Sequence, residues 1–267
     1  TVALVRTAKR HGAAVASSVH VAGLVREGGA VRGVRAEDVE SGRELTIRAR
    51  QVVNATGVWT DQVQDMAGGA SLRVRASKGV HLVVPQDRIR SESGLICRTP
   101  TSVLFVIPWG GHWLVGTTDT DWDLDLAHLT PALTRDDIVG VYAGLRPLLH
   151  GESDATSKLS REHAVTTVAP GLVTVAGGKY TTYRVMAADA VDVVVDALGR
   201  AELRSCTERI PLVGAVGWEA VRNRVGSLAR EHGIPVPRLE GLVARHGAEA
   251  LDLLELVRAE PELAEPL

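Results

Sequence analysis

The 267-residue sequence has few cysteines, no long apolar run and almost no net charge. Cys97 and Cys206 stand far apart and in no metal-ligand spacing, which excludes a disulfide framework and fits buried or inert thiols in a reducing compartment. No apolar run approaches the roughly 18 residues needed to span a bilayer. A net charge of −2 without a cluster of Lys and Arg predicts no nucleic-acid partner.

What is present is an ordinary globular balance, with 45% apolar and 23% charged residues. Hydrophobic periodicity and Gly or Pro punctuation predict a mixed α/β (α+β overall) chain with a mainly antiparallel sheet in the middle and a helical module after Gly199. Helices are expected over residues 2–11, 58–66, 181–198, 217–232, 238–246 and 247–259. Strands are expected over 13–16, 19–26, 30–37, 44–48, 51–54, 72–76, 80–84, 103–108, 113–116, 141–149, 162–168 and 172–176.

The most informative segment runs from Gly177 to Arg184, between an apolar strand pattern and a helix pattern. A strand, a Gly-Gly turn and a helix N-terminus together direct backbone N–H groups and the positive end of a helix dipole at one place. Glycine lets a ligand approach the backbone closely, and Lys179 and Arg184 add positive charge. The local pattern favours about equally a site for an anionic ligand and a plain tight turn with two solvated bases.

Seven segments, in order along nearly the whole chain, resemble the FAD-dependent glycerol-3-phosphate dehydrogenases of the D-amino-acid-oxidase-like flavoprotein superfamily. Each is weakly specific alone, and together they are highly specific. They are Val52-Val53-Asn54-Ala55-Thr56-Gly57, Lys78-Gly79-Val80-His81-Leu82-Val83-Val84-Pro85, Val106-Ile107-Pro108-Trp109, Gly116-Thr117-Thr118-Asp119-Thr120-Asp121, Tyr142-Ala143-Gly144-Leu145-Arg146-Pro147-Leu148, Ser160-Arg161-Glu162-His163 and Gly177 to Arg184.

The sequence departs from this family pattern in three places. The Gly-x-Gly-x-x-Gly loop that binds the FAD pyrophosphate in the family is missing, so we expect the chain to be a piece of a longer protein. The C-terminal helical module looks cut short. A helix that the family carries is almost absent between Leu126 and Leu133. The resemblance implies an incomplete Rossmann-like FAD-binding domain (1–66 and 171–200), an antiparallel-sheet substrate-binding domain (67–170) and an incomplete helical module (204–267).

The resemblance also implies a function for the full-length parent. We expect FAD-dependent oxidation of sn-glycerol 3-phosphate to dihydroxyacetone phosphate, with electrons passed to a membrane quinone. The protein would then be cytoplasmic, peripherally associated with the inner face of the cell membrane, and able to form a homodimer. Two alternatives remain open: an oxidase of the same fold that uses oxygen, and a non-catalytic fragment that binds FAD weakly at best.

On this basis His81 is the candidate general base, since its ordinary pKa suits proton abstraction near pH 7. Without the resemblance a structural histidine would be the better interpretation. Arg146 and Arg161 are the candidate phosphate ligands, because a guanidinium binds phosphate through two parallel hydrogen bonds. For Arg146, a buried structural ion pair is the alternative, and flanking charges make Arg161 look like an edge residue.

The cofactor contacts are expected at two turns and one strand. Lys179 would face the flavin edge that becomes negative on reduction, close to the substrate, together with the N–H groups around it. No metal is expected, because the alternating aspartates of 119–125 lack the glycine and terminal glutamate of a calcium loop. The expected FAD-contacting residues are Val21, Asn54, Ala55, Thr56, Gly57, Gly177, Gly178, Lys179, Tyr180 and Thr181.

Overall fold

The structure is a computed structural model that describes residues 1–267 except 70, 99–102, 119, 122–137, 150–161 and 266–267. It mixes helices and sheets, as the sequence predicts, and forms two compact units. One unit joins Thr1–Ser18 to Cys206–Leu267, and the other is Val19–Ser205. The first eighteen residues therefore group with the C-terminal helices, whereas the sequence placed them with the strands that follow. The finer division of Val19–Ser205 into two domains stays a prediction.

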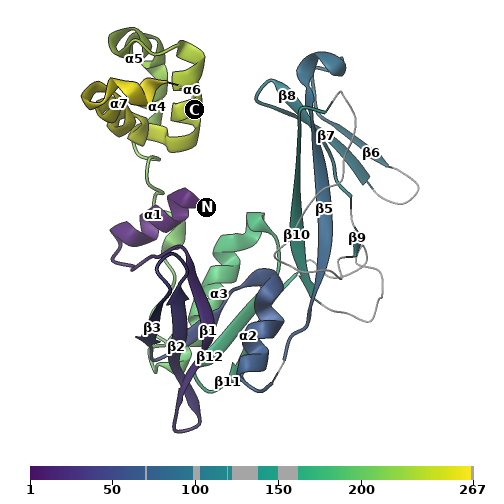
Figure 1. The fold of residues 1–267 in the computed structure, drawn as a ribbon, viewed down its shortest axis with the longest axis vertical. Helices are drawn as coiled ribbons and strands as arrows, with labels where there is room; N and C mark the ends of the chain where they lie inside the picture. Colours follow the sequence, from purple (N-terminus) through teal and green to yellow (C-terminus); the bar gives the residue numbers. More distant parts are fainter. Residues whose placement is uncertain (70, 99–102, 119, 122–137, 150–161, 266–267) are drawn as a thin grey trace. The chain divides into compact units, whose positions relative to one another are not determined.

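The larger unit contains a three-stranded sheet built from β4 (Val52–Asn54), β12 (Leu172–Gly177) and β11 (His163–Ala169). β12 lies in the middle, parallel to β4 and antiparallel to β11. Its first three residues are fully buried, which explains the short, apolar, β-branched pattern of this strand. Two helices, α2 (Thr60–Met66) and α3 (Tyr183–Ala197), follow β4 and β12 after short turns (Figure 1).

A second sheet is the antiparallel meander β1 (Val19–Glu27), β2 (Ala30–Asp38) and β3 (Arg43–Arg48), with turns at Gly28-Gly29 and Ser41-Gly42. It joins the first sheet where the Val31 N–H donates to the Pro170 carbonyl at 2.8 Å. Val31 and Leu172 share a small core with Ala67 at the end of α2. This core fixes the meander to the sheet that carries both strand–turn–helix segments.

The third sheet is larger, with strand order β10-β5-β8-β7-β6 and a short β9 on β5. Its long strand β5 is continuous where the sequence predicted two strands, because β10 pairs along it from Val74 to Val83. β6 and β9 were not predicted. The bounds are β5 (Val74–Pro85), β6 (Leu95–Arg98), β7 (Val103–Trp109), β8 (His112–Gly116), β9 (Thr120–Asp121) and β10 (Gly140–Leu149), with a 3-10 turn at Gln86–Arg88.

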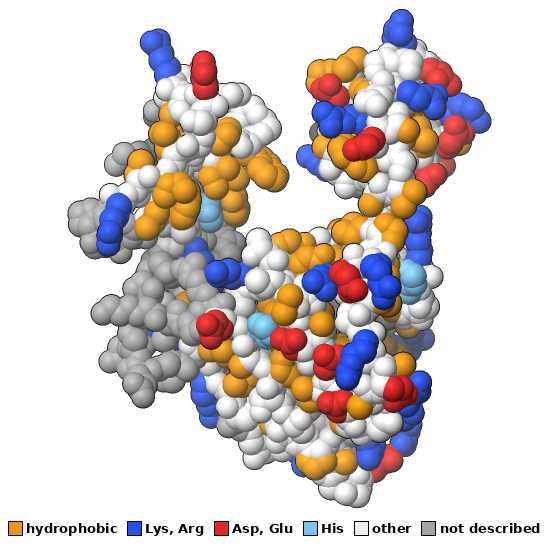
Figure 2. Space-filling view, turned by 180° about the vertical axis from the view of Figure 1, so that it is seen from behind, with side chains coloured by type: hydrophobic (Ala, Val, Ile, Leu, Met, Phe, Trp, Pro, Cys, Tyr) orange, Lys and Arg blue, Asp and Glu red, His pale blue; other side chains and the backbone are white. Residues whose placement is uncertain are grey.

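Apolar side chains are exposed on the outer strands of this sheet. Figure 2 shows hydrophobic side chains gathered over the lobe that holds β6, β7 and β8. The exposed apolar residues of β6 and β7 include Ile96, Ile107 and Trp109, of which Trp109 is 69% exposed. On the neighbouring strand Trp113 is buried, and its indole N–H donates to the Gln86 carbonyl at 3.0 Å. The two faces of the sheet are thus covered to very different extents.

The smaller unit is helical. Its core consists of apolar residues from four helices, as the helical spacing of the sequence predicts. The buried Glu249 accepts hydrogen bonds from Arg6 and Arg10 of the first helix, and Thr7 accepts one from the Val213 N–H at 3.0 Å. The elements are α1 (Val2–Arg10), α4 (Trp218–Asn223), α5 (Val225–His232), α6 (Val236–His246) and α7 (Ala250–Ala259), with 3-10 turns at Thr207–Arg209, Gly247–Glu249 and Pro261–Ala264.

Three local predictions turn out differently. Residues 13–16 form no strand, since no neighbouring strand pairs with them. The helix expected over 217–232 breaks at Arg224, which lets Val221 and Leu228 enter the same core. Cys97 and Cys206 are both exposed, Cys97 because β6 is the last strand of its sheet. The shortened segment between Leu126 and Leu133 and most of the aspartate run lie outside the described residues.

Candidate functional site

Two strand–turn–helix segments end at the same edge of one sheet. β4 and β12 are parallel neighbours, with Asn54 opposite Thr174, so the turns that follow them both lie at the carboxyl edge. The first turn, Ala55–Gly57, leads into a 3-10 turn (Gly57–Trp59) and α2, and the second leads through Tyr180–Thr182 into α3. The first N–H groups of each helix have no partner inside the helix, so this edge offers donors to an anionic ligand.

The side chain of Asn54 holds the first turn together. It is buried, and its amide donates to the Thr60 carbonyl at 3.1 Å and to the Thr174 hydroxyl at 3.4 Å. Its oxygen accepts from the Thr56 hydroxyl at 2.7 Å and from the Thr56 N–H at 3.3 Å. The Asn54 side chain is therefore engaged inside the protein, while Ala55 and Thr56 are exposed and Gly57 is half-buried.

The second turn needs glycine for two reasons. Gly177 and Gly178 have φ values of +78° and +77°, which residues with a Cβ rarely adopt. A Cβ on Gly177 would also meet the Glu162 carbonyl and lie 2.9 Å from Leu149 Cγ, while one on Gly178 would meet Met186. The Gly178 N–H donates to the Glu162 carbonyl at 3.0 Å. These glycines pack tightly against their own chain, which shapes the turn that presents Lys179, Tyr180 and Thr181 to solvent.

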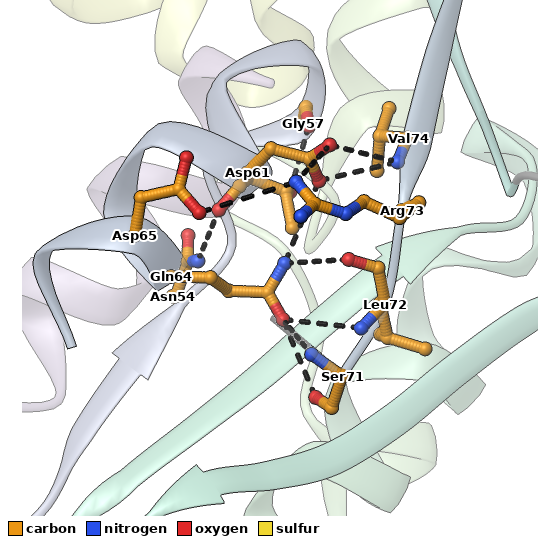
Figure 3. Close-up of polar contacts among 10 residues, drawn as sticks. Asn54, Gly57, Asp61, Gln64, Asp65, Ser71, Leu72, Arg73 and Val74 are labelled. Carbon is orange, nitrogen blue, oxygen red and sulfur yellow. Dashed lines mark hydrogen bonds and ion pairs between the residues drawn. The ribbon is translucent and has the colours of Figure 1, made fainter. Parts of the chain in front are cut away.

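A polar network joins the first turn to the antiparallel sheet (Figure 3). Gln64 of α2 is fully buried, and its amide donates to the Leu72 carbonyl at 2.8 Å while its oxygen accepts from the N–H groups of Ser71 and Leu72. Asp61 accepts from the Val74 N–H at 3.2 Å, at the first residue of β5. The helix that begins at the first turn therefore fixes the start of the strand that carries His81.

The end of β10 contacts both turns. Pro147 Cγ would lie 3.9 Å from a Cβ on Gly57, and Leu149 packs against Gly177. The antiparallel sheet thus begins beside the carboxyl edge of the parallel pair. Arg146 immediately precedes Pro147, so it is held close to this junction.

His81 lies inside β5, opposite Tyr142 of β10 and Gly116 of β8. The sequence placed it at the start of a strand, but it is in the eighth position of a twelve-residue strand, with sheet on both sides. Burial and then the nearby Arg146 guanidinium lower the pKa of the His81 imidazole below its ordinary value of 6.5. The imidazole is therefore neutral near pH 7, the state in which a ring nitrogen can accept a proton.

Arg146 lies on the same face of the sheet as His81. Alternation along the paired strands puts Ser77, Gly79 and His81 on one face with Tyr142, Gly144 and Arg146. The guanidinium lies over Gly79, where Nη1 would be 2.7 Å from a Cβ. Glycine at this position is therefore what lets the arginine lie along the sheet toward His81.

The segment after β8 holds this guanidinium. Arg146 Nη2 donates to the Thr117 hydroxyl at 2.6 Å, and Nη1 donates to the Thr118 carbonyl at 3.2 Å. Thr118 is itself fixed to β5, because its hydroxyl accepts from the Val80 N–H at 3.1 Å. Thr117 and Thr118 thereby fix the guanidinium on the same face of the sheet as His81.

The remaining predicted residues are less well placed by the structure. Lys179 is exposed at the second turn, and its backbone N–H donates to the Thr182 hydroxyl at 3.3 Å. No described contact links Lys179 to His81 or Arg146. Val21 of β1 pairs with Ala36 of β2, and no described hydrogen bond joins Val21 to either turn. Arg161 lies outside the described residues. The roles of these three residues stay predictions.

Sequence reasoning gave no role to Thr117, Tyr142, Asp61 or Gln64, which in the structure contact Arg146, pair with His81 or hold the start of β5. Thr117 and Tyr142 belong to two of the segments that carry the family resemblance, so the signal was present but was not assigned to a role. Asp61 and Gln64 look like ordinary polar positions of a helix.

Within the described residues no group of three His, Cys, Asp or Glu side chains could hold a metal ion, and no helix is long and apolar enough to cross a membrane.

Comparisons with known proteins agree with this geometry. The family described as FAD dependent oxidoreductase matches residues 1–184, which include both turns and the His81 sheet. Glycerol-3-phosphate dehydrogenase 2 of Mycobacterium tuberculosis is 49% identical over the whole chain, and the glycerol-3-phosphate dehydrogenase of Mycobacterium leprae is 50% identical. The chain spans about half the length of these curated relatives, 49% of each.

A solved structure is also similar. The glycerol-3-phosphate dehydrogenase of Bacillus halodurans, complexed with FAD, superposes with a TM-score of 0.84 at 28% identity. The match covers 97% of this chain and 56% of that protein. Because the family match extends over more than half of its residues, the chain belongs to the FAD-dependent oxidoreductases.

Proposed function

We propose that this chain forms the substrate face and part of the FAD site of a glycerol-3-phosphate dehydrogenase. The proposal rests on one observation: His81, whose pKa is lowered, and Arg146, which is hydrogen-bonded to Thr117, lie on one sheet face. This face lies next to the carboxyl edge of the parallel strands β4 and β12. The names of the similar Mycobacterium and Bacillus proteins support the choice of substrate.

The carboxyl edge of β4 and β12 suits part of FAD by the chemistry of its donors. Two helix N-termini and the Lys179 ammonium present positive charge at one edge, which matches an anionic dinucleotide and a flavin that gains negative charge on reduction. Backbone groups of Ala55–Gly57 and Gly177–Thr181 would hold the cofactor. The 267 residues contain no Gly-x-Gly-x-x-Gly sequence. The two turns would therefore form one part of the FAD site, and a pyrophosphate-binding loop would form another.

The sheet face suits a three-carbon phosphate by its spacing. Arg146 places its guanidinium over Gly79, two residues from His81 along β5, which corresponds to about 7 Å between the two side-chain positions. This span matches the separation between a hydroxyl on C2 and a phosphate on C3 when each also makes a hydrogen bond. Gly144 pairs with Gly79, and among the described residues nothing lies within 4 Å of a Cβ on Gly144, so these residues leave the strand surface beside the guanidinium uncovered.

In the reaction, His81 takes the proton from the C2 hydroxyl, and the electron pair of that O–H bond forms the ketone. FAD, when bound, supplies the acceptor for the hydride that leaves C2. Arg146 holds the phosphate through two parallel hydrogen bonds, and Thr117 and Thr118 hold Arg146. The carbon chain would lie over Gly144, between the Arg146 guanidinium and the His81 ring, which aligns the substrate for transfer.

We further propose that the electrons pass to a quinone at the inner face of the cell membrane, where the protein would be peripherally bound. The exposed apolar side chains over β6 and β7 are consistent with a partner surface, but they favour no particular partner. An oxidase that reduces oxygen to peroxide is the second candidate.

The test is an assay of the full-length protein with sn-glycerol 3-phosphate, using a soluble quinone analogue in one arm and oxygen alone in the other. We expect substrate-dependent reduction of the quinone and little peroxide. Peroxide formation at the rate of substrate oxidation would replace the dehydrogenase by an oxidase. Absence of turnover in both arms, with FAD bound, would overturn the choice of substrate.

A further inference from the structure

The ring of Tyr142 lies flat against the ring of His81. The two residues are directly paired across β10 and β5, and their ring centroids are 4.8 Å apart with an angle of 6° between the planes. Such a near-parallel contact leaves the imidazole little freedom to rotate toward β10. Tyr142 is 47% exposed, so its ring borders the open face of the sheet where the substrate is proposed to bind.

Gly116 limits the imidazole from the opposite side. It pairs with His81 across β8, and a Cβ at this position would lie 2.8 Å from His81 Cδ2 and 2.8 Å from the Val80 carbonyl oxygen. Contacts of this length are closer than van der Waals packing allows. The absence of a side chain on Gly116 therefore makes the space into which the His81 ring fits.

Tyr142 and Gly116 enclose this ring by packing. Among the residues that the structure describes, neither ring nitrogen of His81 has a hydrogen-bond partner, although catalytic histidines are commonly oriented by a partner on the second nitrogen. The orientation of the base then depends on the two residues that enclose its ring.

We propose that Tyr142 is a positioning residue for His81 and that Gly116 provides the matching space. Stacking sets the plane of the imidazole on the sheet face where the substrate is proposed to bind. The aromatic face of Tyr142 also stabilises the imidazolium that forms when His81 takes the proton, by a cation–π interaction. This role rests on the proposed function, because it requires that His81 act as the base.

The proposal makes the ring of Tyr142 essential and its hydroxyl dispensable. In the full-length, FAD-loaded protein, Tyr142→Phe keeps the stacked ring and should leave kcat within about threefold of the unaltered protein. Tyr142→Leu removes the ring and should lower kcat about 10- to 100-fold, because misplacement of a reacting group by about 1 Å can cost two orders of magnitude. KM should change much less, since Arg146 and the phosphate contacts remain.

A second measurement does not depend on turnover. The His81 ring protons lie over an aromatic face, so their NMR resonances should carry a ring-current shift that Tyr142→Phe keeps and Tyr142→Leu removes. Gly116→Ala should displace the imidazole and change the same resonances with Tyr142 intact. Bound FAD and the melting temperature of each variant serve as controls for folding.

The outcomes separate the two proposals. If the unaltered protein turns over and His81→Ala does not, but Tyr142→Leu matches Tyr142→Phe in kcat, the positioning role is wrong and the proposed function stands. Equal loss of kcat in Tyr142→Phe and Tyr142→Leu would also contradict it, because the hydroxyl would then be the active group. If His81→Ala retains turnover, the assignment of the base fails together with everything that rests on it.

Discussion

The two parts of the candidate site use different kinds of groups. At the carboxyl edge of β4 and β12, the groups proposed to bind FAD are backbone N–H donors. There the Asn54 side chain is turned inward, and Gly177 and Gly178 have none. On the face of the β5, β8 and β10 sheet, the groups proposed to act on the substrate are the side chains of His81 and Arg146, and the paired backbone sets their spacing. A site for a constant cofactor can rely on backbone shape, whereas recognition and chemistry of a small substrate need specific side chains.

The comparison is sharpest for His81. His81→Ala should lower kcat about 10²–10⁴-fold, the usual range for loss of a general base. FAD content should be unchanged, because no contact of the two turns is altered. Flavin content and steady-state turnover of the full-length protein measure both quantities. Loss of FAD along with activity would mean that His81 supports the cofactor edge as well, and the division between the two parts would be wrong.

Arg146→Lys tests whether the sheet face recognises the phosphate. Lysine keeps the charge but loses the forked geometry and the hydrogen bonds to Thr117 and Thr118, so KM for sn-glycerol 3-phosphate should rise about 10- to 100-fold. Thr117→Val is the matched milder change, since it removes one hydrogen bond, and should raise KM about fivefold. A lost flavin with an unchanged KM in Arg146→Lys would show that Arg146 is structural.

At the cofactor edge, two neighbouring glycines provide a matched pair. Gly177→Ala places its Cβ against the Glu162 carbonyl and near Leu149, at φ +78°, so we expect about 1–3 kcal/mol of destabilisation and weaker FAD binding. Gly178→Ala has the same backbone strain, but its Cβ meets the flexible end of Met186 and should cost less. Thermal melts and FAD titrations can rank the two. A larger loss of stability in Gly178→Ala than in Gly177→Ala would show that the close contact of Gly177 with the Glu162 carbonyl does not determine the shape of this turn.

The pH dependence should give the smallest effect. Because the pKa of His81 is lowered, the acid limb of kcat/KM should lie below pH 6.5, and activity should fall as the pH drops through that lowered value. In the same window the unfolded chain binds more protons than the folded one, so stability also falls. Arg146→Gln removes the second of the two causes, so the limb should move to higher pH and stay below 6.5, since burial remains. If the acid limb does not move in Arg146→Gln, Arg146 does not contribute to the lowered pKa of His81.

The sequence predicted the two regions unequally well, for a physical reason. The turns at Ala55–Gly57 and Gly177–Thr181 are local, so strand, glycine and helix signals within a dozen residues suffice to place them. The sheet face depends on register: Arg146 reaches His81 only because Ser77 pairs with Arg146 and Gly79 has no side chain. Nothing within either segment fixes that pairing. Gln64 and Asp61 escaped for the same reason, since their partners at Ser71–Val74 become visible only in the folded chain.

In the proposed reaction, His81 on the sheet face accepts a proton from glycerol 3-phosphate, and FAD bound at the strand edge would accept the hydride. The most direct test mixes the FAD-loaded full-length protein with sn-glycerol 3-phosphate without oxygen and follows the visible absorbance of the flavin, with glycerol as the control substrate. We expect sn-glycerol 3-phosphate to bleach the flavin absorbance rapidly and glycerol to bleach it slowly or not at all. In His81→Ala we expect a flavin that is bound but not bleached. Bleaching at the same rate in His81→Ala, or by glycerol as readily as by its phosphate, would contradict the proposed reaction.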